Sequence, residues 1–257
     1  MRTVRQYDST DGAGEMRLMV VEDEAALARG GADLVGAAIA TRPQAAVLVA
    51  TGRTPMGMYR ELAQRRQRGE LDTTGLRVFQ LDDYLGLPAD DRRSLYRWMK
   101  SAFLDPLGIP EARVVRLPGG APDPPAACLA YELAVREAGG IDLSILGLGP
   151  NGHLGFNEPG SEPQAPTRVV ELTEASVASN ATYWGGAHLV PRRALTAGMT
   201  VLLAARQTVL VVSGEHKRQV LRRVVQGPPT PEVPASYLRL APRVTVLADR
   251  AAWPATP

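Results

Sequence analysis

The sequence of 257 residues is poor in the residue types that form disulfides and metal sites. It has a single cysteine, Cys128, and three histidines, His153, His188 and His216. One cysteine cannot close a disulfide within the chain, and no group of cysteines and histidines has the spacing of a zinc site. We therefore expect neither a disulfide nor a bound metal.

Long hydrophobic runs are also missing. No stretch approaches the roughly 20 apolar residues that cross a bilayer. The start, MRTVRQYDSTDGAGE, is too polar for a secretory signal. We therefore expect a cytoplasmic protein that has no membrane partner.

Neither sign of charge dominates the chain. Lysine and arginine together number 29 against 27 aspartates and glutamates, and the arginines are scattered. A nucleic-acid surface needs basic residues gathered on one face or stretch, so we expect no nucleic-acid partner. Only Lys100 and Lys217 are lysines, which makes each of them informative.

The sequence does contain an alternation of strand and helix patterns. Runs of apolar and β-branched residues predict strands at 16–23, 45–51, 76–81, 112–117, 141–147, 208–214 and 243–249. Helical patterns lie at 24–41, 55–68, 91–104, 124–138 and 215–226. This alternation predicts a three-layer α/β/α Rossmann-like fold, in which helices cover both faces of a mostly parallel sheet.

A single domain accounts for most of the chain. The hydrophobic content of 45% can fill one large core, and we place this domain at 16–250. Residues 1–15 are expected to be a flexible tail, and residues 251–257 a C-terminal tail. Prolines and polar residues at 157–192 surround one short helical segment near 174–183, so we expect a lid around 160–190.

The loop TGRTP at 51–55 follows a predicted strand and opens a helix. Ligands of open α/β sheets bind at the carboxyl ends of the strands, where this loop lies. Gly52 permits a sharp turn, Thr54 is placed as N-cap and Pro55 at the first helical position. Its backbone N–H groups and the helix dipole favour an anion. The alternative is an ordinary capped helix.

The stretch LDDYLGLP at 81–88 has paired carboxylates, Asp82 and Asp83, after the next strand. Successive side chains of a strand point to opposite faces, so only one of the two enters a crevice. An ionised aspartate there can accept a proton. The alternative is a pair that forms a turn or caps a helix.

The stretch SGEHKRQ at 213–219 places Lys217 in the first turn of a predicted helix. The helix dipole disfavours a cation at that position unless an anion is bound nearby. We therefore expect Lys217 to contact an anion, with a solvated lysine as the alternative. His216 and Arg218 are expected to point elsewhere.

The loop GLGPNGHLGFNEP at 147–159 combines four glycines with His153. An imidazole changes its protonation state close to neutral pH, so it can carry a proton to and from a substrate. Glu158 can orient the imidazole and Asn151 can supply hydrogen bonds, which predicts a catalytic group. The alternative is a structural histidine in a turn.

Taken together, TGRTP, LDDYLGLP, GLGPNGHLGFNEPG, LVPRRALTAGM and SGEHK resemble the glucosamine-6-phosphate deaminase/isomerase family over about residues 16–249. Related 6-phosphogluconolactonases share the fold and a similar histidine loop, but the FNEP continuation at 156–159 favours the deaminase branch. The resemblance implies an enzyme of amino-sugar metabolism without metal or nicotinamide. Such an enzyme opens the ring of glucosamine 6-phosphate, moves a proton from C2 toward C1, and releases ammonia and fructose 6-phosphate.

The resemblance also assigns roles to residues. His153 matches the group that opens the ring, Glu158 and Asn151 match its partners, and Asp82 matches the base at C2. Some members have aspartate at the position of Asn151. Substrate contacts are implied for the remaining matching positions: Thr51, Gly52, Thr54, Asp83, Gly152 and Lys217.

The phosphate end departs from the family pattern at two positions. Arg53 stands where many members have a small residue, and Thr182 stands where an arginine that contacts the phosphate is usual. A threonine cannot reproduce the bidentate contact of an arginine. We therefore hypothesise that Arg53 binds the same anion from its loop.

The resemblance leaves other functions open. The substrate could be a different amino-sugar phosphate, such as galactosamine 6-phosphate, and the reaction could be that of a 6-phosphogluconolactonase. A third hypothesis is that the protein binds a sugar phosphate as a sensor and has no catalytic activity. Because the family contains both monomers and hexamers, the chain is expected to act as a monomer or as a homo-oligomer.

Overall fold

The computed structural model describes residues 3–8, 15–88 and 90–254. The strands of its large sheet are β1 (Thr3–Asp8), β2 (Glu15–Val21), β3 (Ala46–Val49), β4 (Arg77–Gln80), β6 (Val114–Val115), β7 (Leu143–Gly147), β10 (Gln207–Val212) and β11 (Arg243–Asp249). Their order is β1-β2-β11-β10-β7-β3-β4-β6. All neighbouring pairs from β2 to β6 are parallel, and only β1 runs antiparallel.

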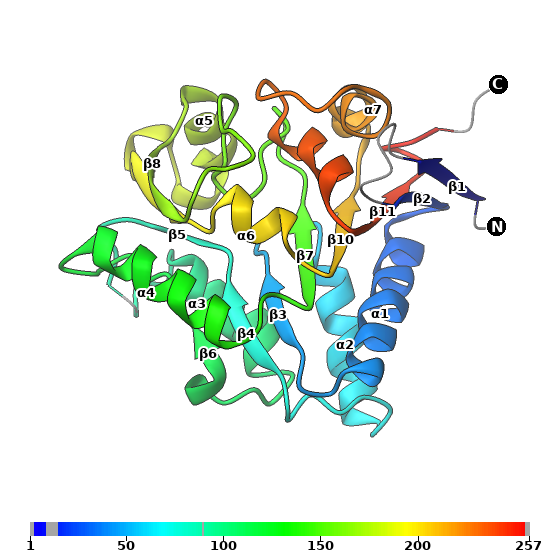
Figure 1. The fold of residues 1–257 in the computed structure, drawn as a ribbon, viewed down its shortest axis with the longest axis horizontal. Helices are drawn as coiled ribbons and strands as arrows, with labels where there is room; N and C mark the ends of the chain where they lie inside the picture. Colours follow the sequence, from blue (N-terminus) through cyan, green and yellow to red (C-terminus); the bar gives the residue numbers. More distant parts are fainter. Residues whose placement is uncertain (1–2, 9–14, 89, 255–257) are drawn as a thin grey trace.

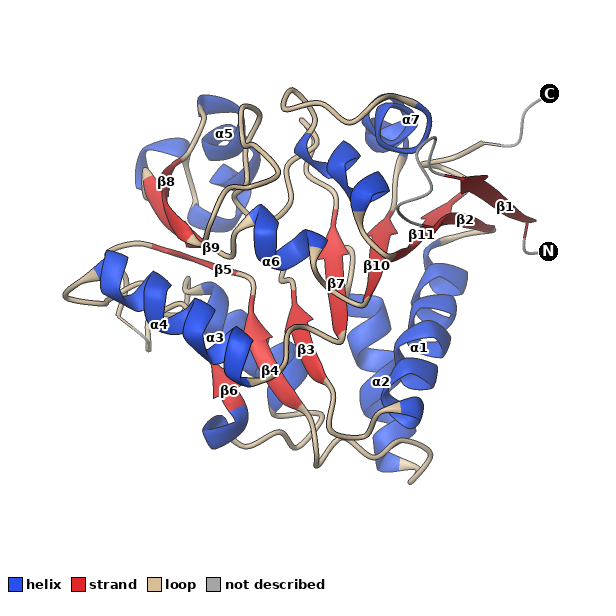
Figure 2. Ribbon diagram, in the orientation of Figure 1, coloured by secondary structure: helices blue, strands red, loops and turns tan. Residues whose placement is uncertain are grey.

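Helices cover both faces of this sheet (Figures 1 and 2). One layer contains α1 (Glu24–Thr41), α2 (Met56–Gln67), α3 (Leu95–Met99) and the π-helical turn η1 (Lys100–Leu104). The other contains α4 (Pro124–Glu137), α6 (Met199–Leu203), α7 (Arg218–Gln226) and the 3-10 helix η5 (Pro234–Leu240). Short 3-10 turns, η2 (Glu111–Arg113) and η4 (Glu215–Lys217), precede β6 and α7. The predicted three-layer fold is confirmed.

The residues of β3 show why the strands form continuous apolar runs. Leu48 belongs to the core that α4 and α7 cover, whereas Val47 and Val49 belong to the core that α1 and α2 cover. Successive side chains of a strand alternate between the two faces, and both faces here are closed to water. Each strand and each helix predicted for these layers is present.

A second, three-stranded antiparallel sheet lies beside the first. It consists of β5 (Asp82–Tyr84), β9 (Arg193–Thr196) and β8 (Arg168–Glu171), in that order. Next to it lie α5 (Glu174–Trp184) and η3 (Ala187–Leu189), and this region has its own core of buried apolar residues, including Tyr84, Phe156 and Trp184. The helix in the predicted lid region is confirmed, while movement of this region as a lid stays a prediction.

The predicted tails contain ordered structure. Residues 3–8 form β1, which pairs with the otherwise open edge of β2 and satisfies its backbone groups, so a flexible tail is wrong for them. In the C-terminal tail, Ala252 and Trp253 are buried against the core. Residues 1–2, 9–14 and 255–257 lie outside the described residues.

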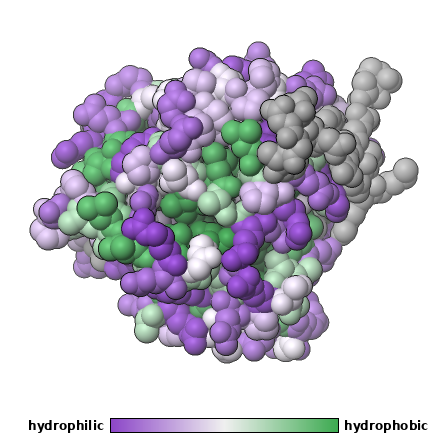
Figure 3. All heavy atoms as spheres, in the orientation of Figure 1, coloured by the Kyte–Doolittle hydropathy of each residue, from purple (hydrophilic) through white to green (hydrophobic). Residues whose placement is uncertain are grey.

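The outer surface is largely hydrophilic on the face shown in Figure 3. Hydrophobic residues gather over α4, where Leu129 and Leu133 are exposed one helical turn apart. Among the described helices, none is long and apolar enough to cross a membrane.

Candidate active site

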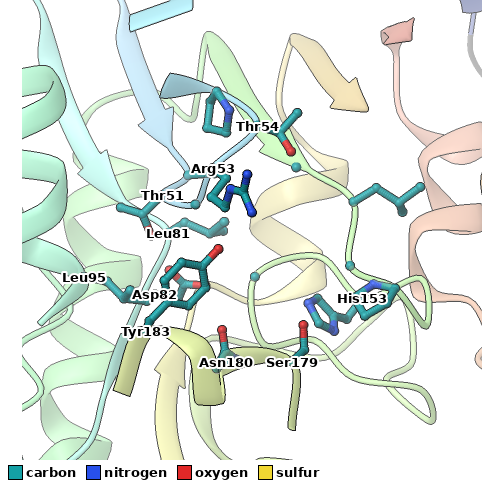
Figure 4. Close-up of a pocket in the computed structure, with 18 of the residues that line it drawn as sticks. Thr51, Arg53, Thr54, Leu81, Asp82, Leu95, His153, Ser179, Asn180 and Tyr183 are labelled. Carbon is teal, nitrogen blue, oxygen red and sulfur yellow. The ribbon is translucent and has the colours of Figure 1, made fainter. Parts of the chain in front are cut away.

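A cavity of about 450 Å³ opens at the carboxyl ends of the parallel strands. Its walls come from the loops that follow β3, β4, β7 and β10, together with α5. Strands β3 and β7 are neighbours in the sheet. From β3 the strand order runs through β4 and β6 to one edge, and from β7 it runs through β10 and β11 toward the opposite edge. Ligands of open α/β sheets bind at such a switch point. Asp82 and His153 lie on opposite sides of the cavity (Figure 4).

Asp82 lines the cavity from the point where β4 ends and β5 begins. Its side chain is buried. Burial and the negative charge of Asp83 raise the pKa of Asp82 to about 8. A carboxyl group whose pKa lies close to the working pH can both take up and release a proton, which suits a general base.

Asp83 points away from the cavity, so the substrate contact expected for it is wrong. Its carboxylate accepts hydrogen bonds from Ser94 Oγ at 2.8 Å, from the backbone N–H of Leu95 at 2.9 Å and from Gln80 Nε2 at 3.0 Å. These contacts fix the start of α3 against β5. The alternation of side chains along the strand sends only Asp82 into the crevice, as the sequence predicts.

His153 lines the cavity, and the residues expected to support it lie behind the imidazole. Its Nδ1 lies 3.5 Å from Glu158 Oε2. Asn151 Nδ2 donates to the same carboxylate oxygen at 3.0 Å, and Asn151 Oδ1 accepts from the backbone N–H of His153 at 3.3 Å. The structure therefore brings all three residues together.

Glu158 is held as a carboxylate by its surroundings. Burial by itself raises its pKa, but hydrogen bonds and charge from His153, with further contacts to Ser176 and Asn151, lower the pKa to about 2. A carboxylate beside Nδ1 favours a proton on that nitrogen. The arrangement can therefore accept and return protons at the imidazole.

The glycines of this loop allow close packing around the imidazole. A Cβ at Gly149 would lie 2.2 Å from Cδ2 of His153, so only glycine lets the ring lie against the backbone there. Gly152 has a φ of +90°, and a Cβ on it would lie 2.6 Å from Val233 Cγ1. Gly152 turns the loop beside the residues that line the cavity, and the substrate contact expected for it stays a prediction.

The loop after β3 and the turn before α7 form a positively charged end of the cavity. Thr51, Gly52, Arg53, Thr54 and Lys217 all line it. The predicted N-cap role of Thr54 is wrong, because α2 begins one residue later than expected, with Pro55 as N-cap and no side-chain cap. The Thr54 side chain is therefore available to the cavity.

Lys217 is partly buried, and burial lowers its pKa to about 8. Within the described part of the chain, neither Lys217 nor Arg53 forms an ion pair with an acidic side chain. Two cations without acidic partners, beside the N-terminus of α2, fit an anionic group of a ligand.

Comparison with known proteins identifies the family. The sequence matches the family model for glucosamine-6-phosphate isomerases/6-phosphogluconolactonase over residues 22–247. The chain belongs to this family. A glucosamine-6-phosphate deaminase of Cutibacterium acnes is 43% identical over 238 residues, which is 92% of this chain and 91% of that protein. One of Halothermothrix orenii is 38% identical over 237 residues, 92% of this chain and 98% of that protein.

Solved structures of the family agree with the fold. A monomeric glucosamine-6-phosphate deaminase superposes with a TM-score of 0.89 at 35% identity and covers 91% of this chain and 98% of its own. The 6-phosphogluconolactonase of Leishmania guyanensis superposes with a TM-score of 0.74 at 21% identity, covering 93% and 98%, which shows the shared fold alone. The resemblance inferred from the sequence motifs is confirmed.

In this member of the family, α5 supplies a wall of the cavity that the sequence does not reveal. Ser179, Asn180 and Tyr183 point into the cavity from α5 (Figure 4). The Tyr183 ring packs on Trp98, with ring centroids 5.3 Å apart, and Thr182 also lines the cavity. The helix itself is predictable, but its polar residues do not indicate which side faces a ligand.

Two further side chains line the cavity. They are His216, which was expected to point elsewhere, and Trp98. His188, for which the sequence suggests no role, is exposed on η3. No group of three or more metal-ligating side chains occurs among the described residues.

Proposed function

We propose that this protein converts glucosamine 6-phosphate and water to fructose 6-phosphate and ammonia. The main support for this proposal is that His153 and Asp82 lie on opposite sides of one cavity. The cations Arg53 and Lys217 line one end of the same cavity. The relatives named glucosamine-6-phosphate deaminase, at up to 43% identity, support it. The sugar phosphate is charged and does not cross a bilayer unaided, so we place the enzyme in the cytoplasm.

His153 opens the sugar ring in this proposal. Its imidazole removes the proton of the anomeric hydroxyl and delivers a proton to the ring oxygen, so the C1–O5 bond breaks and an aldehyde forms at C1. Glu158 supports the ring while it is positively charged, and Asn151 holds Glu158 in place through its 3.0 Å hydrogen bond. The result is the open-chain aminoaldose.

Asp82 acts as the base in the second step, the isomerisation of the open-chain sugar. In its ionised form it removes the C2 proton, and that proton returns at C1 while the C1 oxygen gains a proton and the nitrogen loses one, which converts the aminoaldose into a ketose imine. Water then adds at C2 and ammonia leaves, giving fructose 6-phosphate. Burial of Asp82 favours proton transfer, because it keeps the pKa of the carboxyl group near neutral instead of near 4.

The cationic end of the cavity binds the phosphate. Lys217 supplies a point charge, and the backbone N–H groups at the start of α2 supply hydrogen bonds. We further propose that Arg53 compensates for the threonine at position 182, where many family members carry an arginine. The guanidinium group of Arg53 lies at the cavity wall, from which it can contact two phosphate oxygens.

An assay with three substrates tests the proposal. Purified protein is mixed separately with glucosamine 6-phosphate, galactosamine 6-phosphate and 6-phosphogluconolactone, while ammonia, ketose phosphate and acid are followed. We expect equal amounts of ammonia and ketose phosphate from the glucosamine compound. Acid release from the lactone alone, preserved in Asp82→Asn, contradicts the proposal, because lactone hydrolysis has no use for a base at C2.

A further inference from the structure

The first turn of α5 places two hydroxyl groups against the proposed catalytic pair. Ser176 Oγ lies 3.4 Å from Nδ1 of His153, and Thr173 Oγ1 donates to Glu158 Oε2 at 3.3 Å. Ser176 is 0% exposed, so water cannot replace its hydroxyl at the imidazole. Helix α5, which forms one wall of the cavity, therefore also contacts the His153 imidazole at Nδ1.

We infer that Ser176 is a positioning residue, whose hydroxyl accepts a hydrogen bond from Nδ1–H of His153 and donates its own proton to the Glu158 carboxylate. This keeps the proton of the neutral ring on Nδ1 and leaves Nε2 free to accept a proton from the sugar. The inference rests on the proposed function for its catalytic consequence, and on geometry for the hydrogen-bond direction.

The partners of Glu158 argue for this direction. Glu158 Oε2 is the more distant partner of Nδ1, at 3.5 Å, and it already accepts from Asn151 and Thr173. Glu158 Oε1 is buried without a hydrogen-bond partner among the described residues, so the carboxylate still has a free acceptor. Ser176 is among the groups that lower the pKa of Glu158, which is consistent with a hydroxyl proton directed toward this carboxylate. A hydroxyl beside a carboxylate donates to it, and its lone pair then remains for Nδ1–H.

The opposite direction would disable the imidazole. If Ser176 donated to Nδ1, the neutral ring would carry its proton on Nε2, and that nitrogen could not accept the hydroxyl proton of the sugar. Ser176 therefore acts together with Glu158 to keep the proton of the neutral ring on Nδ1.

Ser176 is not needed as the cap of its helix. Thr173 is the N-cap of α5, and its Oγ1 accepts from the backbone N–H of Ser176 at 3.2 Å. The Ser176 hydroxyl makes no contribution to that cap. Its removal therefore leaves the helix start intact and changes the surroundings of the imidazole.

The test is the nitrogen NMR spectrum of the histidine rings in Ser176→Ala. The chain has only three histidines, so the spectrum of protein labelled with ¹⁵N-histidine is simple, and His153→Gln identifies the signals of His153. Spectra are recorded at about pH 9, where ordinary histidines are neutral. We expect the parent protein to show a protonated Nδ1 and an unprotonated Nε2 for His153. Ser176→Ala is expected to shift the ring toward a mixture of tautomers.

Kinetics provide the second measurement. We expect kcat of Ser176→Ala to fall about 10- to 100-fold, the usual effect of losing a residue that orients a reactive side chain, with KM changed less than about twofold. Ser176→Thr keeps the hydroxyl and is expected to retain the parent tautomer. Ser101→Ala is the matched control, because the exposed Ser101 hydroxyl only donates to the carbonyl of Trp98.

A parent spectrum with the proton on Nε2 of His153 overturns the inference. So does a Ser176→Ala protein whose His153 signals and kcat equal those of the parent. Because the spectra do not depend on turnover, they separate the two proposals. A protonated Nδ1 that is lost in Ser176→Ala, in a protein that does not deaminate glucosamine 6-phosphate, rejects the proposed function and retains the positioning role.

Discussion

The backbone of Gly155 lies against the carboxyl group of Asp82. A Cβ on Gly155 would lie 3.2 Å from Asp82 Oδ2 and 3.0 Å from Thr196 Oγ1. The loop that contains His153 thus packs directly on Asp82, which lies where β4 ends and β5 begins. This contact fixes the two proposed catalytic groups relative to each other, although 71 positions separate them in the sequence.

Gly155→Ala is expected to lower kcat about tenfold or more, because the new methyl group displaces the Asp82 carboxylate from its position. The residue has a φ of +58°, so the substitution also costs about 1 kcal/mol of stability. Gly160→Ala is the control, since Gly160 has a φ of +94° with no atom within 4 Å of its added Cβ. Equal losses of kcat in the two variants, with melting temperatures lowered alike, contradict a specific contact with Asp82.

Asp82→Asn is expected to abolish turnover and to stabilise the fold. The pKa of Asp82 is raised to about 8 in the folded protein, so the carboxyl group keeps its proton after folding over a pH range in which the unfolded chain has lost it. Stability of the parent therefore falls as pH rises from about 4 to 8, and the asparagine removes this loss, on the order of a few kcal/mol. Urea unfolding at several pH values measures the difference.

Asp83→Asn is the matched control for Asp82→Asn. The amide has one acceptor oxygen for the donors of Ser94, Leu95 and Gln80, so at least one buried donor loses its partner, at a cost of about 1–3 kcal/mol. Burial raises the pKa of Asp83 as well, but only Asp83→Asn leaves buried donors without partners, so it should be the less stable of the two variants. If both destabilise the protein equally, the burial cost assigned to Asp82 is wrong.

The pH dependence of kcat/KM is expected to be a narrow bell. The rising limb reflects loss of the Asp82 proton, whose pKa is about 8, because only the carboxylate can act as base. The falling limb reflects loss of the Lys217 charge, whose pKa burial lowers to about 8. Lys217→Arg keeps its charge at every accessible pH, so this variant should lose the falling limb. Identical profiles for parent and variant would show that Lys217 does not set the limb.

Glu158→Gln is expected to lower stability at neutral pH by about 2 kcal/mol, after allowance for screening by solvent. The pKa of Glu158 is lowered to about 2 in the folded protein, so its contribution is present above pH 4.5 and disappears as pH falls toward 2. Parent and variant should therefore become equally stable in acid. Glu171→Gln, at an exposed position, is the control. A constant gap between the parent and Glu158→Gln down to acid pH contradicts this account.

Arg53→Ala is expected to raise KM for glucosamine 6-phosphate about tenfold with little change in kcat, because the phosphate lies away from the reacting carbons. Arg60→Ala is the control, since Arg60 is exposed on α2 and does not line the cavity. An unchanged KM in Arg53→Ala rejects the idea that Arg53 replaces the arginine that many family members carry at the position of Thr182.

The order of the elements and the loops of the site follow from the sequence alone. Strands buried on both faces, such as β3, consist of apolar residues throughout. The helices between them have apolar residues at helical spacing, so local sequence patterns predict the three-layer fold. The glycine-rich loop at 147–159 and the paired aspartates are likewise recognisable where they stand. From these the sequence determined the family and the proposed catalytic residues Asp82, His153 and Glu158.

Only the tertiary structure decided which side chains meet. Strands β8 and β9 have four residues each. They form because β9 pairs with both β8 and β5, so no local sequence pattern predicts them. Asp83 is held at the start of α3 by Ser94, and Gly152 packs on Val233, which lies 81 positions further along the chain. Ser176 contacts His153 only because α5 packs over the loop of the histidine. Contacts between segments that are distant in the sequence depend on how the elements pack, so a local sequence pattern does not predict them.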